Sequence, residues 1–175
     1  MILEQVYLGP MNKELKETLE LYHNLIHLSM NQTYTISLKL FPKLPSLRIL
    51  ELKDNSISDK DIIYIKENYP QLYSLDISYN LITKVVSFNV LEDIPLSILK
   101  LKGNPLFENI SSDSKVYKTI YQMIPTLEII DDTNTNVFKL YCTKSSKVDN
   151  VAKQSNNISQ MKKRRRNNPE IIVID

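Results

Sequence analysis

Residues Leu72-Tyr73-Ser74-Leu75-Asp76-Ile77-Ser78-Tyr79-Asn80 read L-x-x-L-x-L-x-x-N, with Ile77 at the third apolar place. The same pattern recurs at Leu47–Asn55 and at Leu96–Asn104, so that the three closing asparagines are 25 and 24 residues apart. Looser copies are found at Leu25–Thr33, with Thr33 at the asparagine place, and around Leu3, Val6 and Leu8. The pattern restarts at Leu127–Asp131 and then stops.

This period and pattern are typical of leucine-rich repeats. In such repeats the apolar places point into the core, the asparagine side chain binds backbone groups at the turn after each short strand, and stacked repeats build one continuous core. We therefore predict an α/β fold: a right-handed leucine-rich-repeat solenoid with a concave parallel β-sheet and with helices or irregular segments on the convex side. Five repeats and a closing half-repeat are expected.

The segments between the repeats differ in their patterns. Met11–Leu21 has the spacing of a short amphipathic helix, whereas Thr33–Leu44 is predicted to be irregular. A helix is expected to begin within Ser58–Asp61 and to end at Pro70. A second helical spacing runs from Val116 to Pro125 and predicts a C-terminal helical cap, because the last repeat would otherwise expose its core edge.

Composition and charge divide the chain into a body and a tail. Residues 143–175 have eight basic and three acidic residues, a net charge of +5, whereas the first 142 residues have 14 basic and 17 acidic residues, a net charge of −3. The tail is rich in Ser, Lys, Asn and Gln and is too polar to bury a core. We predict a repeat domain over residues 1–142, with its cap at about 105–142, and a disordered basic tail over residues 143–175.

The remaining composition excludes several classes of protein. No apolar run approaches the about 18 residues of a membrane span, and the start of the chain lacks the features of a secretory signal, so no membrane contact is expected. The single Cys142 cannot form an intramolecular disulfide. The chain has two glycines and no Gly-rich phosphate loop. His23 and His27 are four residues apart, but no set of Cys, Asp or Glu residues completes a metal-binding site with them. We expect no catalytic residue, no metal and no cofactor.

The concave face is the predicted site for a partner, since solenoids bind ligands there. Residues between the apolar places should point outward on that face, with Glu51, Asp76 and Lys100 at equivalent places on adjacent strands about 5 Å apart. The alternative is that these charges are only solvated and pair with one another. The predicted contact residues are Tyr7, His27, Ser29, Ile49, Glu51, Lys53, Ser74, Asp76, Ser78, Ile98, Lys100 and Lys102.

Two motifs lie in the predicted tail. One run of five basic residues, Lys162, Lys163, Arg164, Arg165 and Arg166, predicts nuclear import or electrostatic contact with nucleic acid. The alternative is that the run is incidental and only solvated. The run Ile171, Ile172, Val173 and Ile174, flanked by Glu170 and Asp175, resembles a SUMO-interacting motif, which adds a strand to a partner's sheet edge. A chance apolar terminus, or docking onto this protein's own sheet, is the alternative.

A known family shares several of these stretches. Leu50–Ser58, Lys66–Leu72 and Leu75–Asn80 resemble the repeat domain of the acidic leucine-rich nuclear phosphoprotein family, and Val116–Asp131 resembles its C-terminal cap. The spliceosomal A-prime protein shares this cap type, and mRNA-export receptors contain a similar repeat domain. The resemblance implies a non-enzymatic nuclear adaptor acting on histones, phosphatases or transport factors. The family's name refers to a long acidic tail, whereas the tail here is basic.

These observations predict a monomeric nuclear adaptor, with shuttling to the cytoplasm left open, that binds a partner protein on the concave sheet. The partners implied are a histone, an export factor or a protein with an RNA-binding domain. The alternative is an RNA-processing subunit, similar to the spliceosomal A-prime protein or to mRNA-export receptors, whose basic tail also contacts RNA. A phosphatase regulator is the third hypothesis.

Overall fold

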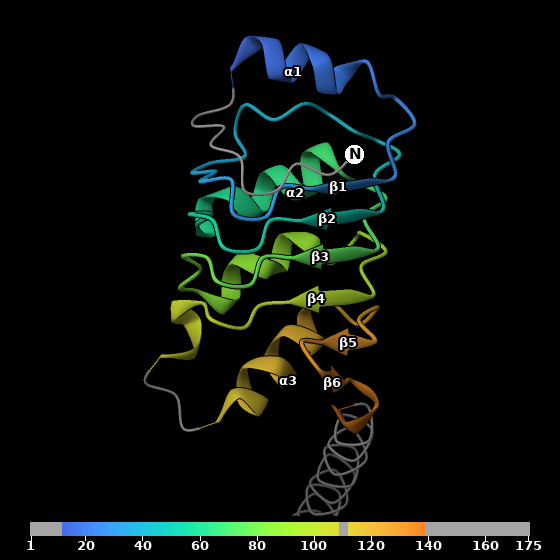
Figure 1. Cartoon of the computed structure of the whole chain (residues 1–175). Helices are drawn as coiled ribbons and strands as arrows, with labels where there is room; N and C mark the ends of the chain where they lie inside the picture. The colour runs from blue at the N-terminus through green and yellow to red at the C-terminus, as the bar shows by residue number, and fades with distance from the viewer. Residues whose placement is uncertain (1–11, 109–111, 139–175) are drawn as a thin grey trace, which may run out of the picture. The chain divides into compact units, whose positions relative to one another are not determined.

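Each of four successive repeats contributes one three-residue strand to a single sheet. The computed structural model describes residues 12–108 and 112–138. Its first four strands are β1 (His27–Ser29), β2 (Ile49–Glu51), β3 (Ser74–Asp76) and β4 (Ile98–Lys100), which are parallel and lie side by side in chain order (Figure 1). Strands β5 (Ile129–Ile130) and β6 (Thr133–Asn134) complete the sheet. The predicted α/β leucine-rich-repeat fold is confirmed.

The connecting segments follow the predicted order of helical and irregular pieces. The helices are α1 (Lys13–Glu20), α2 (Ile62–Asn68) and α3 (Asp113–Met123), and the 3₁₀-helices are η1 (Asp59–Asp61), η2 (Val85–Leu91) and η3 (Pro105–Phe107). The segment predicted to be irregular, Thr33–Leu44, contains no helix or strand. The helix predicted to stop before Pro70 ends at Asn68. No helix in the described part of the chain is long and apolar enough to cross a membrane.

The apolar places of the three complete repeats form the centre of the core. All of these side chains are fully buried: Leu47, Leu50, Leu52, Leu72, Leu75, Ile77, Leu96, Leu99 and Leu101. Burying one such side chain stabilises a fold by about 1.5–3 kcal/mol. Because each repeat shares its core with the next, this burial exists only in the stacked array.

The asparagines bind the turns of neighbouring repeats together. The Asn80 side chain donates to the carbonyl oxygens of Ile77 and Ser78 in its own turn and of Leu52 in the preceding repeat. Its Oδ1 accepts a 2.9 Å hydrogen bond from the Ile57 backbone N–H. The predicted role of the asparagines is confirmed. Thr33 keeps only part of this pattern, because its hydroxyl donates to the carbonyl of Met30 in its own turn.

A left-handed residue precedes the asparagine place in each described repeat. These residues have positive φ values: Gln32 (54°), Asp54 (57°), Tyr79 (53°) and Gly103 (78°). Only the last is a glycine, the residue that adopts this conformation without steric cost. The turn geometry is therefore imposed by the asparagine hydrogen bonds and the buried core rather than by local preference.

The cap closes the sheet with a reversal that differs from the predicted all-parallel pattern. Strand β5 pairs parallel with β4, but β6 pairs antiparallel with β5. The reversal is a two-residue turn at Asp131 and Asp132, and Asp131 has a φ of 51°, which aspartate tolerates better than most residues. Helix α3 buries Val116 and Ile120 against the core, so the predicted helical cap is confirmed.

The chain divides into two compact units. The first ends at Thr135, and the second, of which residues 136–138 are described, begins at Asn136. The predicted boundary at residues 142–143, the predicted tail and the first degenerate repeat around Leu3, Val6 and Leu8 lie outside the described residues.

Candidate partner-binding surface

The strand register places the predicted charged residues in one row. Glu51 is paired with Asp76 across β2 and β3, and Asp76 with Lys100 across β3 and β4. The Nζ of Lys100 lies 3.4 Å from Oδ2 of Asp76. The neighbouring carboxylates of Glu51 and Asp76 would repel each other, and the positive charge of Lys100 offsets one of their two negative charges. We use the name charged row for these three residues.

The two ends of the charged row differ in accessibility. The Lys100 side chain is 53% exposed, whereas the side chains of Glu51 and Asp76 are 32% and 13% exposed. Nε2 of His27 lies 3.4 Å from Oε2 of Glu51, so a protonated His27 would form an ion pair there. Asp76 is held in place because its Oδ1 accepts hydrogen bonds from the backbone N–H and the hydroxyl of Ser78.

Two of the predicted contact residues are not exposed. Ser29 has no exposed surface and Ser78 is 5% exposed, so the expectation that both present side chains on the concave face is wrong. The physical reason is local hydrogen bonding: the Ser29 hydroxyl accepts from the Asn31 side chain, and the Ser78 hydroxyl donates to Asp76. Both serines position neighbouring polar groups instead of facing a partner.

A second row runs beside the charged row and is mostly apolar. The register aligns His27, Ile49, Ser74, Ile98 and Ile129 across the first five strands. The first four side chains are half-buried and Ile129 is 36% exposed. Side chains from adjacent strands on one face of a sheet touch each other, so this row offers a continuous strip beside the charges.

Lysines gather where strands β2 to β4 end. Lys53, Lys100 and Lys102 line a pocket of about 170 Å³ with Tyr79, Asp76, Ser78, Asp131 and Asp132. The Nζ of Lys53 lies 5.5 Å from the centroid of the Tyr79 ring, within cation–π range. Sequence reasoning missed Tyr79 as part of this surface. The available signal was the position of Tyr79 immediately before the repeat asparagine, because the chain turns away from the strand direction there.

The carboxylate of Asp131 connects this surface to the cap. Its Oδ1 accepts hydrogen bonds of 2.7 and 3.0 Å from the backbone N–H groups of Leu101 and Lys102. Its Oδ2 accepts a 2.7 Å hydrogen bond from the Tyr117 hydroxyl. Burial first, and then this bond to Asp131, raise the pKa of Tyr117 above its usual range. Sequence reasoning also missed Asp131 as part of this surface. It follows Ile130 at the place that Lys100 holds after Leu99 in the preceding repeat.

Several predicted site residues cannot be placed. Tyr7, the basic run Lys162–Arg166 and the apolar run Ile171–Ile174 lie outside the described residues. Within residues 12–108 and 112–138, no group of three His, Cys, Asp or Glu side chains could hold a metal ion.

Similar proteins share one family name. No family model matches the chain. A Plasmodium falciparum protein named acidic leucine-rich nuclear phosphoprotein 32-related protein is 31% identical over 136 residues, which are 77% of this chain and 47% of that protein. The acidic leucine-rich nuclear phosphoprotein 32 family member A of Drosophila pseudoobscura is 34% identical over 116 residues, 66% of this chain and 42% of that protein. This chain thus spans less than half the length of these two relatives.

A solved structure shows the same fold. The crystal structure of the Drosophila melanogaster SNF/U2A' complex contains a chain that matches with a TM-score of 0.57 and 22% identity, over 74% of this chain and 70% of that chain. At this identity the likeness concerns the fold alone. The sequence similarity to the acidic leucine-rich nuclear phosphoprotein 32 family rests on the two relatives above, at 31% and 34% identity, and it confirms the predicted resemblance.

Proposed function

We propose that this protein is a non-enzymatic nuclear adaptor that binds a partner protein on the concave face of its sheet. The observation that carries the proposal is the charged row of Glu51, Asp76 and Lys100, which the strand register aligns beside a mostly apolar strip. Such a surface combines an apolar contact area with charges that select the partner's orientation. The nuclear location is supported by the names of the relatives, which are called nuclear phosphoproteins.

The alternative function is an RNA-processing subunit that binds a partner with an RNA-binding domain. It is supported by the fold likeness to a chain from the SNF/U2A' complex, itself an assembly of proteins. In this case the basic run Lys162–Arg166 would add phosphate contacts, and RNA recovery would fall steeply as salt rises. In the adaptor proposal, the partner is recovered without RNA.

Charge reversal on the concave face tests the adaptor. The double variant Glu51→Lys and Asp76→Lys should abolish recovery of the partner from nuclear extract. Because Asp76→Lys also leaves the Ser78 donors unpaired, it should lower the free energy of unfolding by about 1–3 kcal/mol, and circular dichroism should show that the variant is still folded. The matched control reverses two exposed carboxylates on the connecting segments, Glu67→Lys and Glu92→Lys. Undiminished recovery by the first variant, or equal loss by the control, would refute the concave face as the binding site.

Import is tested separately from binding. We propose that the run Lys162–Arg166 directs the protein to the nucleus. Replacing its five residues by glutamine should leave the protein in the cytoplasm with an unchanged unfolding curve. A nuclear signal equal to that of the unaltered protein would exclude this role.

A further inference from the structure

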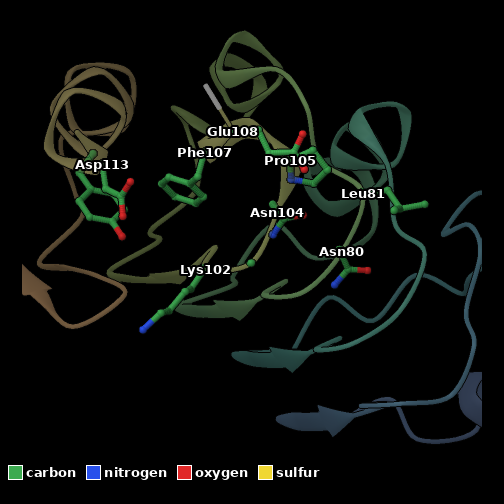
Figure 2. Close-up of a pocket in the computed structure, with 10 residues that line it drawn as sticks. Asn80, Leu81, Lys102, Asn104, Pro105, Phe107, Glu108 and Asp113 are labelled. Carbon is green, nitrogen blue, oxygen red and sulfur yellow. The ribbon is translucent and has the colours of Figure 1, made fainter. Parts of the chain in front are cut away.

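A second pocket lies outside the concave face, between the last repeat and the cap. It has a volume of about 480 Å³ and is formed by the turns at Asn80 and Asn104, by η3 and by the first half of α3. Only Lys102 is common to this pocket and to the predicted concave contacts. In Figure 2 the ring of Phe107 lies between Pro105 and Asp113. We call this the cap pocket.

One wall of the cap pocket is an aromatic pair. The ring centroids of Phe107 and Tyr117 are 5.6 Å apart, with an angle of 67° between the ring planes, an edge-to-face arrangement. The hydrogen bond from the Tyr117 hydroxyl to Asp131 fixes one ring. The η3 segment that carries Phe107 is anchored by the buried Leu106. The wall is therefore present before any ligand arrives.

The rim of the cap pocket is acidic. Glu108 and Asp113 both line it and are exposed, and neither carboxylate has a hydrogen-bond or ion-pair partner among the described residues. Lys102 is the one cationic residue among those that line the pocket. The lining thus has a net charge of −1. These carboxylates can bind a cationic group without breaking a contact within this part of the chain.

This combination suits a side chain with an apolar stem and a cationic head. Aromatic faces attract ammonium and guanidinium groups, and the stems of lysine and arginine bury along apolar surface such as Leu81 and Pro105. Carboxylates then accept charge-assisted hydrogen bonds from the head group. We propose that the cap pocket binds a lysine or arginine side chain of a partner protein, as a contact separate from the concave face.

The test uses the full chain, labelled with ¹⁵N, and three peptides of the form acetyl-Gly-Gly-X-Gly-Gly-amide in which X is arginine, lysine or norleucine. The arginine and lysine peptides should shift the amide resonances of Phe107, Glu108 and Tyr117, and norleucine, which has the stem without the charge, should not. Equal shifts with norleucine, or shifts confined to other residues, would overturn the proposal.

Two variants separate charge from aromatic contact. Glu108→Gln with Asp113→Asn should weaken arginine binding about tenfold, because it removes two charged acceptors. Phe107→Leu should weaken it about threefold. The matched control Glu92→Gln with Glu128→Gln changes the net charge equally at two exposed sites outside the pocket and should bind as the unaltered chain does. Equal weakening by the control would show a general charge effect and refute the pocket.

The chain's own basic run is the competing occupant. If replacing Lys162–Arg166 by glutamine strengthens arginine-peptide binding tenfold or more, the pocket is occupied by this chain, and the assignment to a partner is wrong. The concave variant Glu51→Lys with Asp76→Lys should bind the peptide normally. A failure of the concave proposal and a failure of the cap-pocket proposal are therefore distinguishable.

Discussion

Asp59 and Asp61 are two residues apart and bind opposite neighbours in the stack of repeats. The Asp59 carboxylate accepts hydrogen bonds from the Thr83 hydroxyl and from the backbone N–H of Lys84 in the following repeat. The Asp61 carboxylate accepts hydrogen bonds from the Ser37 hydroxyl and from the backbone N–H of Leu38 in the preceding repeat. One short 3₁₀ segment thus connects three consecutive repeats on the convex side.

Removing the Asp61 carboxylate should destabilise the fold strongly. Asp61 is 2% exposed and also accepts from the N–H and hydroxyl of Ser58. Asp61→Ala leaves these donors unpaired, including the buried N–H of Leu38, and should cost about 3 kcal/mol in urea unfolding at neutral pH. Asp61→Asn keeps one acceptor oxygen and should cost less. A loss below about 1 kcal/mol for alanine would show that water replaces these bonds.

Asp59 should contribute stability that depends on pH. Partial burial alone would raise its pKa, but hydrogen bonds from Thr83, Lys84 and Ser87 outweigh burial and hold the pKa below 3.8. A lowered pKa in the folded state adds stability above pH 3.8, and this stability is lost as the pH falls through the lowered value.

The variant Asp59→Asn should therefore be less stable than the unaltered protein by about 1 kcal/mol at neutral pH. The difference should shrink as the pH falls from 3.8 through the lowered pKa, because the unfolded chain binds the Asp59 proton first and the folded chain binds it only at the lower pH. Unfolding free energies measured in urea across this range check the prediction. A difference that stays constant down to about pH 2 would assign the effect to packing instead of charge.

Tyr69 should be replaceable by phenylalanine with a gain in stability. Its side chain is fully buried, and its hydroxyl has no hydrogen-bond partner among the described residues. Such a hydroxyl has lost its water without compensation, so Tyr69→Phe should stabilise the fold by about 1 kcal/mol. Destabilisation of that size would show that the hydroxyl has a partner.

Alkaline pH gives a second measurement on Tyr69. Burial raises its pKa above the ordinary value of 10. The raised pKa in the folded state means that stability is complete below pH 10 and is lost as the pH rises beyond it. The advantage of Tyr69→Phe should therefore grow above pH 10, whereas Tyr22→Phe, at an exposed tyrosine, should not show this growth.

The repeat period predicted the sheet and its register because each strand repeats the same apolar triplet. The alignment of Glu51, Asp76 and Lys100 follows from that period alone, since equivalent places on parallel strands become neighbours. The burial of Ser78 could not be predicted in this way. It depends on whether the Ser78 hydroxyl bonds to solvent or to Asp76, and the repeat period does not determine which of the two it does.

The cap pocket was also beyond the sequence pattern. Phe107 and Tyr117 follow the last complete repeat and have no equivalent in earlier copies. Their contact depends on the direction of α3, which the bond between Tyr117 and Asp131 helps to set. That bond joins residues 14 apart in the chain. A periodic pattern carries no information about a structure that occurs once.

Gly103 is the place where the turn before the asparagine requires glycine. Its φ is +78°, and a Cβ added there would lie 2.5 Å from Cδ1 of Tyr79. Gly103→Ala should therefore destabilise the protein by about 2 kcal/mol, because backbone strain adds to the displacement of the tyrosine ring. Urea unfolding measures the loss.

A double-mutant cycle separates strain from contact. Tyr79→Ala removes the ring that obstructs the new methyl group, so the alanine at position 103 should cost less in that background, by about 1 kcal/mol. The remaining cost measures the positive φ. Asp54→Ala is the matched comparison, because Asp54 holds the same left-handed place one repeat earlier than Tyr79 without contacting Gly103's added Cβ. The cost of Gly103→Ala should be unchanged by it. If Gly103→Ala costs the same in all three backgrounds, the Tyr79 ring moves away freely, and backbone strain alone explains why glycine occupies this turn.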